Sequence, residues 1–333
     1  MKIAVDAMGS DNRPAPDVAG AVLAARELGA AMLLVGDESV IRRELAAHNT
    51  SGLRLDVVHT AEAVDMTDKP SVVGKEKPNS SMHVGMSLVK NGDASAFVTM
   101  GNTGAALAIA TLYTLRRIPG IKRPALGQVV RIKGGNVFLV DIGANADSKP
   151  EWMVQFAVMG KVYAERVLHI VEPRVALLSN GEEEGKGNQL IRETSALLHQ
   201  LPINYVGNVE PKDVLDGKTD IVVADGFVGN IAVKTFEASG RFLGGLIRDE
   251  LKRDVFSMLG GLLARPALRR VYEQVDPFEV GGALLLGVNG VVIVGHGRSN
   301  ARAVKNAIRQ AHQAVTGQIV QSIQSGVEHP LAE

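Results

Sequence analysis

Short polar loops rich in glycine, asparagine and aspartate follow several apolar runs of this 333-residue chain and hold its best candidates for chemistry. The central loop is Gly101-Asn102-Thr103-Gly104, which follows the apolar run 96–100 and precedes an alanine-rich stretch. Asn102 and Thr103 stand where a helix N-cap belongs. The first N–H groups of a helix lack intrahelical partners and carry the positive end of its dipole. The sequence therefore predicts an anion site at residues 101–104.

Five further apolar runs end in loops of the same kind, and a helical pattern follows each. With their loops, these runs cover residues 2–11, 137–147, 175–188, 220–230 and 291–300. Strands that alternate with helices indicate an α/β fold with a mostly parallel sheet covered on both faces. Because ligands bind beyond the carboxyl ends of parallel strands, we expect the six loops to face one crevice.

Charged and amide side chains in these loops are candidates for substrate binding and catalysis. They are Asp141, Asn145, Lys186, Asn188, Asp225, Asn230, Lys234 and His296. Lys186 is flanked by glycines, which lets its segment lie close to a ligand. Asp141, Asp147 and Asp225 are also a possible cation site. We favour their use as helix caps and loop anchors, and we expect no metal.

Common cofactor and nucleophile motifs do not occur. The glycine loops match neither the Walker A spacing nor the G-x-G-x-x-G dinucleotide fingerprint, since Asn300 stands where the last glycine of 295–300 belongs. A G-x-S-x-G nucleophile elbow is absent, and so is cysteine. We therefore expect no covalent enzyme intermediate and no disulfide.

The segment 68–82 is irregular and rich in lysine before a helix expected at 83–90. It contains Lys69, Lys75 and Lys77, followed by Ser80 and Ser81. Two interpretations stay open. The segment is either a solvated loop with an ordinary serine N-cap, or a basic flap that closes on an anionic ligand, with both serines donating at the helix start.

A helical hairpin is predicted at about 241–275, where apolar residues recur at helical spacing around a Gly-Gly tip. Basic residues flank this tip: Lys252, Arg253, Arg265, Arg269 and Arg270. Packing on a second subunit, contact with a membrane surface and contact with an acidic protein are all compatible with this pattern.

Overall composition limits the class of protein. The chain is 46% hydrophobic, which supplies an ample core. Its 36 basic and 36 acidic residues cancel, which argues against a nucleic-acid partner. The lack of cysteine fits a reducing cytoplasm.

Eight motifs in order resemble the bacterial phosphate acyltransferases of glycerolipid synthesis, called PlsX, over nearly the whole chain. They are VDAMGSD (5–11), DKP with a basic run into SSM (68–82), GNTGA (101–105), DIGANAD (141–147), NGEEEGKGN (180–188), DGFVGNIAVKT (225–235), GGALLLGVNG (281–290) and HGRSNARA (296–303).

This resemblance implies a homodimeric three-layer α/β/α enzyme, one domain over 1–333 with the hairpin as an insertion. The implied fold is similar to isocitrate and isopropylmalate dehydrogenases and to phosphate acetyltransferase. The implied reaction is reversible transfer of a long-chain acyl group from acyl carrier protein to inorganic phosphate, without a cofactor. The acyl phosphate would pass to a membrane glycerol-3-phosphate acyltransferase, so we expect a cytoplasmic protein at the inner face of the membrane.

The residue chemistry agrees with the implied reaction. Phosphate is already an anion at neutral pH, so it needs binding and orientation more than a strong base. We expect the helix starts at 80–81 and 101–104, with Lys186, to hold it. Asn102, Asn188, Asn230 or a lysine would stabilise the oxyanion. Asp225 would position a lysine or accept a proton, and His296 would protonate the departing thiolate.

Two other functions were weighed. A metal- and NAD-dependent decarboxylating dehydrogenase would need a compact aspartate cluster, which three scattered aspartates match poorly. A non-enzymatic membrane scaffold built on the hairpin would leave the polar loops unexplained.

Overall fold

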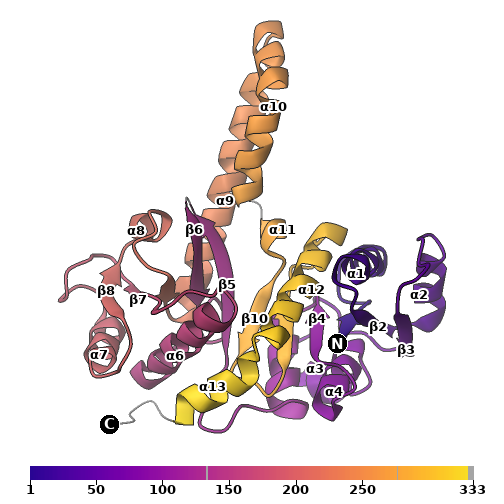
Figure 1. Ribbon diagram of the computed structural model, residues 1–333, viewed down its shortest axis with the longest axis horizontal. Helices are drawn as coiled ribbons and strands as arrows, with labels where there is room; N and C mark the ends of the chain where they lie inside the picture. The colour runs from indigo at the N-terminus through magenta and orange to yellow at the C-terminus, as the bar shows by residue number, and fades with distance from the viewer. Residues whose placement is uncertain (133, 276, 329–333) are drawn as a thin grey trace.

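The computed structural model describes residues 1–132, 134–275 and 277–328, and it has an α/β architecture (Figure 1). The strands are β1 (Lys2–Asp6), β2 (Ala31–Gly36), β3 (Leu55–His59), β4 (Ala96–Thr99), β5 (Ala125–Ile132), β6 (Gly135–Val140), β7 (Val175–Leu178), β8 (Tyr205–Val209), β9 (Ile221–Val223), β10 (Ala283–Leu286) and β11 (Val291–Val294). The helices are α1 (Ala15–Leu28), α2 (Glu38–Leu45), α3 (Pro70–Glu76), α4 (Ser81–Asn91), α5 (Thr103–Ala108) with the π-helical turn η1 (Ile109–Tyr113), α6 (Pro150–Arg166), α7 (Gln189–Leu198), α8 (Pro211–Leu215), α9 (Gly226–Leu251), α10 (Val255–Val275), α11 (Pro277–Val280), α12 (Ala301–Thr316) and α13 (Ile319–Glu328).

All described strands form one sheet in the order β3-β2-β1-β4-β11-β10-β5-β6-β9-β7-β8. Most neighbours are parallel, but three successive pairs, β11 with β10, β10 with β5 and β5 with β6, are antiparallel. Three reversals leave β6, β9 and β7 pointing opposite to β1, β4 and β11. The expectation that all six polar loops gather at one sheet edge is therefore wrong, because the two groups of strands end at opposite edges.

Both faces of the sheet are buried, as the continuous apolar runs predicted. On β1, Ile3 and Val5 join the core under α1 and α12, whereas Ala4 joins a core under α4 and α5 on the other face. A third cluster covers the second face near β9 and α9. The second face is thus covered by two separate groups of helices, and the gap between them lies between α5 and α9.

The predicted helical hairpin is present, although its first helix begins at Gly226 and not near 241. Buried residues of α9 all precede residue 238, and the rest of α9 projects with α10 away from the sheet (Figure 1). Large apolar side chains cover the projecting part, including Phe242, Phe256 and Leu263. Within the described ranges, no helix is both long and apolar enough to cross a membrane.

Local structure agrees with one further prediction and differs from another. Lys133-Gly134-Gly135 between the apolar runs 127–132 and 136–140 predicts a β-hairpin. Strands β5 and β6 pair in this way, and Lys133 lies outside the described residues. The segment expected to be irregular up to residue 81 contains α3, so that part of the prediction is wrong. Pro70 begins α3 and packs against Gly104, where an added Cβ would lie 2.6 Å from Pro70 Cγ. Packing against α5 therefore stabilises α3, a short helix that the sequence pattern does not predict.

Candidate active site

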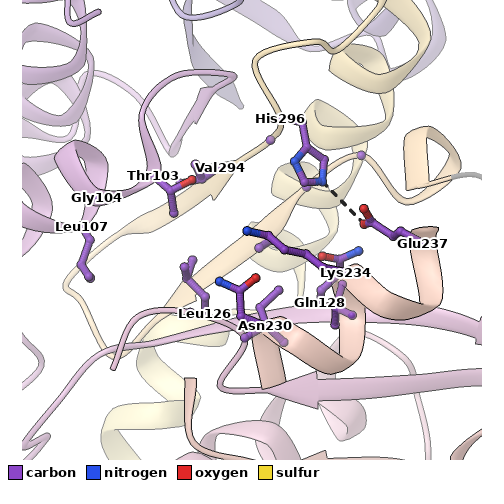
Figure 2. A pocket seen from close by; sticks show the side chains of 17 residues that line it. Thr103, Gly104, Leu107, Leu126, Gln128, Asn230, Lys234, Glu237, Val294 and His296 are labelled. Carbon is purple, nitrogen blue, oxygen red and sulfur yellow. Dashed lines mark ion pairs between the residues drawn. The ribbon is translucent and has the colours of Figure 1, made fainter. Parts of the chain in front are cut away.

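A cavity of about 320 Å³ lies over the central strands, between α5 and α9 (Figure 2). It is lined by Thr103, Gly104, Leu107, Leu126, Gln128, Ile142, Gly143, Asn230, Val233, Lys234, Glu237, Gly281, Gly282, Ala283, Val294, Gly295 and His296. A second hollow of about 280 Å³ shares Gly143, Asn230 and Lys234 and is bounded by Phe227 and Ile231. Five residues selected from the sequence therefore meet in one cavity: Thr103, Gly104, Asn230, Lys234 and His296.

Helix α9 brings together residues from the two opposite sheet edges. Asn230, Lys234 and Glu237 are four and three residues apart, so they share one face of the helix. Asn230 lies beside Gly143, just after β6, whereas Glu237 lies beside His296, just after β11. Seven residues of helix cover about 10 Å, enough to cross the short central strands. The cavity therefore forms along α9, whose side chains reach loops at both ends of the central strands. It does not form from loops at one end of the sheet.

The polar end of the cavity is an ion-pair cluster around Glu237. His296 Nε2 lies 3.6 Å from Glu237 Oε1, and Arg298 Nη2 lies 3.9 Å from Oε2. Glu237 is 6% exposed, but the His296 side chain is 45% exposed and open to the cavity. Burial raises the pKa of Glu237, but the close contact with His296 and the charges of His296, Arg298 and Arg241 outweigh burial and hold that pKa below the usual range.

Lys234 points into the cavity between Asn230 and His296 (Figure 2). Within the described chain no carboxylate forms a salt bridge with Lys234. Its ammonium group and the Asn230 amide are thus available to an anionic ligand. The wall beside them is apolar and includes Leu107, Leu126 and Val294.

Asp141 and Asn145 lie beneath the cavity wall and shape it. The buried Asp141 carboxylate accepts hydrogen bonds from the backbone N–H groups of Leu126, Gly143, Ala144 and Asn145 and from Asn145 Nδ2, at 2.8 to 3.1 Å. Burial raises the pKa of this carboxyl, and the N–H donors oppose that effect. Both residues therefore have buried structural partners.

The same loop fixes α9. At Gly229 an added Cβ would lie 2.0 Å from the carbonyl oxygen of Asp141, so only glycine allows this approach. Gly226 N donates to the Asn145 carbonyl at 2.8 Å. Asp225 is the N-cap of α9, and its Oδ1 accepts from the N–H groups of Phe227 and Val228. These contacts determine where Asn230 and Lys234 point.

The predicted anion loop after β4 is only partly open to the cavity. Thr103 and Gly104 line it, but Gly101 is buried, and its N–H donates to Thr99 Oγ1 at 3.0 Å. Asn102 caps α5 through Oδ1, and its Nδ2 donates to the carbonyls of Met66 and Asp68. The Asn102 amide therefore ties the 65–68 segment to α5.

The candidate flap is packed in place by internal contacts. Lys77 Nζ lies 2.6 Å from Asp68 Oδ2 and 3.5 Å from Asp65 Oδ2, so its charge is balanced within the segment. Ser80 and Ser81 are buried at the start of α4, where Ser80 is the N-cap. They do not line the cavity.

Lys186 and Asn188 lie on the loop after β7, at the same sheet edge as Gly143 but two strands further along. Neither residue lines the cavity. Asn188 is the N-cap of α7 and accepts from Ile191 N at 3.0 Å.

A second polar cluster is buried at the ends of β1 and β4. Asp17 Oδ2 accepts from Ser10 Oγ at 2.5 Å, and Asp6 Oδ2 accepts from Thr99 Oγ1 at 2.7 Å. Burial, together with the neighbouring charge of Asp6, raises the pKa of Asp17 to about 8. The cluster fixes the VDAMGSD loop and does not line the cavity.

Two polar residues of the cavity were not selected from the sequence. Gln128 lies within β5, and Glu237 lies two residues beyond the DGFVGNIAVKT motif. Helical spacing from Asn230 through Lys234 would have identified Glu237, since the three residues share one face. No sequence signal identifies Gln128, whose position depends on the pairing of β5 with β10.

Comparison with known proteins places the chain in a family. Residues 1–322 match a family model described as "Fatty acid synthesis protein". Phosphate acyltransferase from Geobacter sulfurreducens is 46% identical over 333 residues, covering 100% of this chain and 94% of that protein. The phosphate acyltransferase of Trichlorobacter lovleyi is 47% identical, with 97% and 93% coverage.

Solved structures support the fold. A phosphotransacetylase from Streptococcus pyogenes superimposes with a TM-score of 0.61 at 17% identity, covering 96% of this chain and 94% of that one. The expected likeness to phosphate acetyltransferase is therefore confirmed at the level of fold. Because the family model and the relatives cover nearly the full length, the chain belongs to the phosphate acyltransferase family.

Proposed function

We propose that this protein reversibly transfers a long-chain acyl group from acyl carrier protein to inorganic phosphate, giving acyl phosphate for glycerol-3-phosphate acylation. The observation that carries the proposal is a cavity in which Lys234 and His296 adjoin an apolar wall. Lys234 forms no salt bridge with a described carboxylate, whereas His296 lies against Glu237. An anion and an acyl thioester could meet there.

In the first step, phosphate binds at Lys234 and Asn230. The ammonium charge and the amide N–H groups neutralise and orient phosphate oxygens, and the partly enclosed cavity strengthens this attraction. Thr103 is available as a further hydroxyl donor on the opposite wall. Orientation contributes most here, because phosphate needs no proton removed before it attacks.

In the second step, a phosphate oxygen forms a bond to the thioester carbonyl carbon, and the carbonyl oxygen becomes an oxyanion. Gln128 and Asn230 carry amide donors suited to that charge. The C–S bond then breaks, and His296 gives its proton to the departing thiolate. Glu237 holds the imidazole in place through its contact at Nε2, so the transferred proton is the one on Nδ1. The sequence also predicts Lys186 as a phosphate contact. Lys186 does not line the cavity, and Lys186→Ala tests that prediction directly.

Binding of the acyl chain is proposed at the apolar side of the cavity and the adjoining hollow. Phe227 and Ile231 are exposed there, next to Lys234. Homodimer formation and contact with the inner face of the membrane, near the acyltransferase that uses the product, are proposed for the hairpin. Its exposed apolar side chains support such contacts.

The proposal is tested by trapping acyl phosphate with hydroxylamine after mixing the protein with long-chain acyl carrier protein, with and without phosphate. We expect hydroxamate that depends on phosphate and is lost in Lys234→Ala. The folded protein's failure to form hydroxamate from any acyl donor would overturn the proposal. NAD-linked oxidation and lipid binding without turnover would then be the activities to measure.

A further inference from the structure

A basic surface lies at residues 116–123, beside a hollow of about 740 Å³ formed by 111–112, 116–124 and Trp152. Four of its residues carry exposed positive charges: Arg116, Arg117, Lys122 and Arg123. The chain contains no acidic residue from position 94 to position 140. None of the four cations forms a salt bridge with a described carboxylate. We call this surface the basic loop.

The basic loop is held rigidly by the structure around it. Ile118 N donates to the Gly287 carbonyl at 3.0 Å, and Asn289 donates to the carbonyls of Arg116 and Arg117 at 3.0 Å. Lys122 N donates to Gln155 Oε1 at 2.8 Å. Such bonds fix the backbone from which the four cations project before any partner arrives, which lowers the entropic cost of binding.

An aromatic residue extends the basic loop. Trp152, the only tryptophan of the chain, has Arg123 Cζ 4.8 Å and Lys149 Nζ 5.9 Å from its ring centroid. Tryptophan and arginine are enriched at the centres of protein interfaces. The surface therefore combines positive charge with an aromatic anchor.

The basic loop adjoins the cavity. Leu107 lines the cavity and Thr111 lines the basic hollow, one helical turn further along. Leu126 lines the cavity, and Pro124, two residues earlier, lines the hollow. Asn145 Nδ2 donates to the Pro124 carbonyl at 2.8 Å, joining the two walls.

We propose that the basic loop is the docking surface for an acidic protein that delivers the acyl thioester. The inference rests on the proposed function, in which the donor is acyl carrier protein. Charge complementarity identifies the partner, since acidic carboxylates would face four cations that form no salt bridge with a described carboxylate. The thioester arm of a protein docked here would have a short path to the cavity.

The location of the basic loop favours a protein over a membrane. Strand β10 begins three residues after α11, at the base of the hairpin, and ends at Leu286. The next residue, Gly287, accepts the hydrogen bond from Ile118 N. The basic loop thus lies at the end of β10 away from the apolar hairpin (Figure 1). Hairpin cations are less suited to the partner, because acidic residues intervene and Arg253 pairs with Glu250 at 3.3 Å.

The test compares two double charge reversals, Lys122→Glu with Arg123→Glu in the basic loop and Lys252→Glu with Arg253→Glu in the hairpin. In low salt we expect the basic-loop variant to raise the KM for acyl carrier protein about tenfold or more. Its kcat and its turnover of a neutral acyl-pantetheine thioester should stay within twofold of wild type. The hairpin variant should keep the wild-type KM.

Three results would overturn the docking proposal: an unchanged KM in the basic-loop variant, an equal loss with both donors, or loss of binding to anionic vesicles with an unchanged KM. Direct titration with holo acyl carrier protein separates this inference from the proposed function. If wild type makes no acyl phosphate, tight binding that the basic-loop charges control would still support docking, and absent binding would refute it.

Discussion

The buried carboxylates and the cavity side chains differ in how they use their polar atoms. Asp141, Asp17 and Asp225 each accept at least one hydrogen bond from an N–H or O–H group of the fold. Lys234 and His296 are exposed and direct their polar ends into the cavity. Except for Asp17, the residues of both sets belong to the motifs quoted above. A polar residue in a motif therefore either stabilises the fold or takes part in binding and catalysis. Residues that stabilise the fold are buried and hydrogen-bonded to it.

Replacing Asp141 should have the largest effect, and it should fall on stability. Asp141→Ala removes the acceptor of five N–H donors, four of them from the backbone, and each buried unsatisfied donor costs about 1–3 kcal/mol. Partial rearrangement leaves an expected loss of at least about 3 kcal/mol in the free energy of unfolding, measured by urea denaturation. The exposed neighbour variant Asp147→Ala should change it by less than about 0.5 kcal/mol. Equal losses of unfolding free energy in the two variants would contradict the structural role of Asp141.

Replacing Lys234 should affect activity and not stability. Lys234→Ala removes the cation proposed to bind phosphate, so kcat/KM for phosphate should fall about 10²–10³-fold. The melting temperature should stay near that of wild type because the side chain is exposed. Lys90→Ala on α4 is the matched control and should keep full activity. A stable Lys234→Ala with normal kinetics would remove Lys234 from the site.

Asp17 should make stability depend on pH. Its folded-state pKa of about 8 lies above its unfolded value near 4, so the native state keeps a proton that the unfolded chain has lost. The contribution of Asp17 to stability is then lost as pH rises from about 4 to 8, by roughly 1.4 kcal/mol per pH unit at most. Relative to Asp17→Asn, wild type should weaken over this range in urea denaturation. Parallel curves would contradict the shifted titration.

Glu237 shares features of both sets, since it is buried like the structural carboxylates but faces His296 in the cavity. Replacing Glu237 should have the smallest effect of the four substitutions. Glu237→Gln keeps the side-chain size and loses the charge beside His296 and Arg298. We expect kcat to fall about tenfold, with KM for phosphate within twofold, because the histidine is no longer held for proton transfer. Glu237→Asp should recover part of kcat, and Glu193→Gln on α7 should change nothing. A KM effect alone would instead place Glu237 in substrate binding.

Local pattern was enough to predict much of the fold and part of the site. Apolar runs ending in glycine and asparagine loops predicted the strands, the α/β class and the β5–β6 hairpin, and helical spacing predicted the projecting hairpin. Thr103, Gly104, Asn230, Lys234 and His296 were selected because they adjoin those loops, and the cavity contains all five.

Residue patterns therefore predict the helices, the strands and the loops that carry polar residues, since these depend on contacts between near neighbours. Which loops meet depends on strand order, and strand order is a property of the folded chain. Three antiparallel pairs at the centre of the sheet place the β7 loop with Lys186 at the opposite edge from His296, and no local pattern records that order. Glu237 and Gln128 enter the cavity, and Asp141 and Asn145 are buried beneath it, because α9 packs across paired strands far apart in the chain. Strand order and helix packing depend on the burial of apolar faces from distant parts of the chain. The spacing of residues along the chain does not determine either of them.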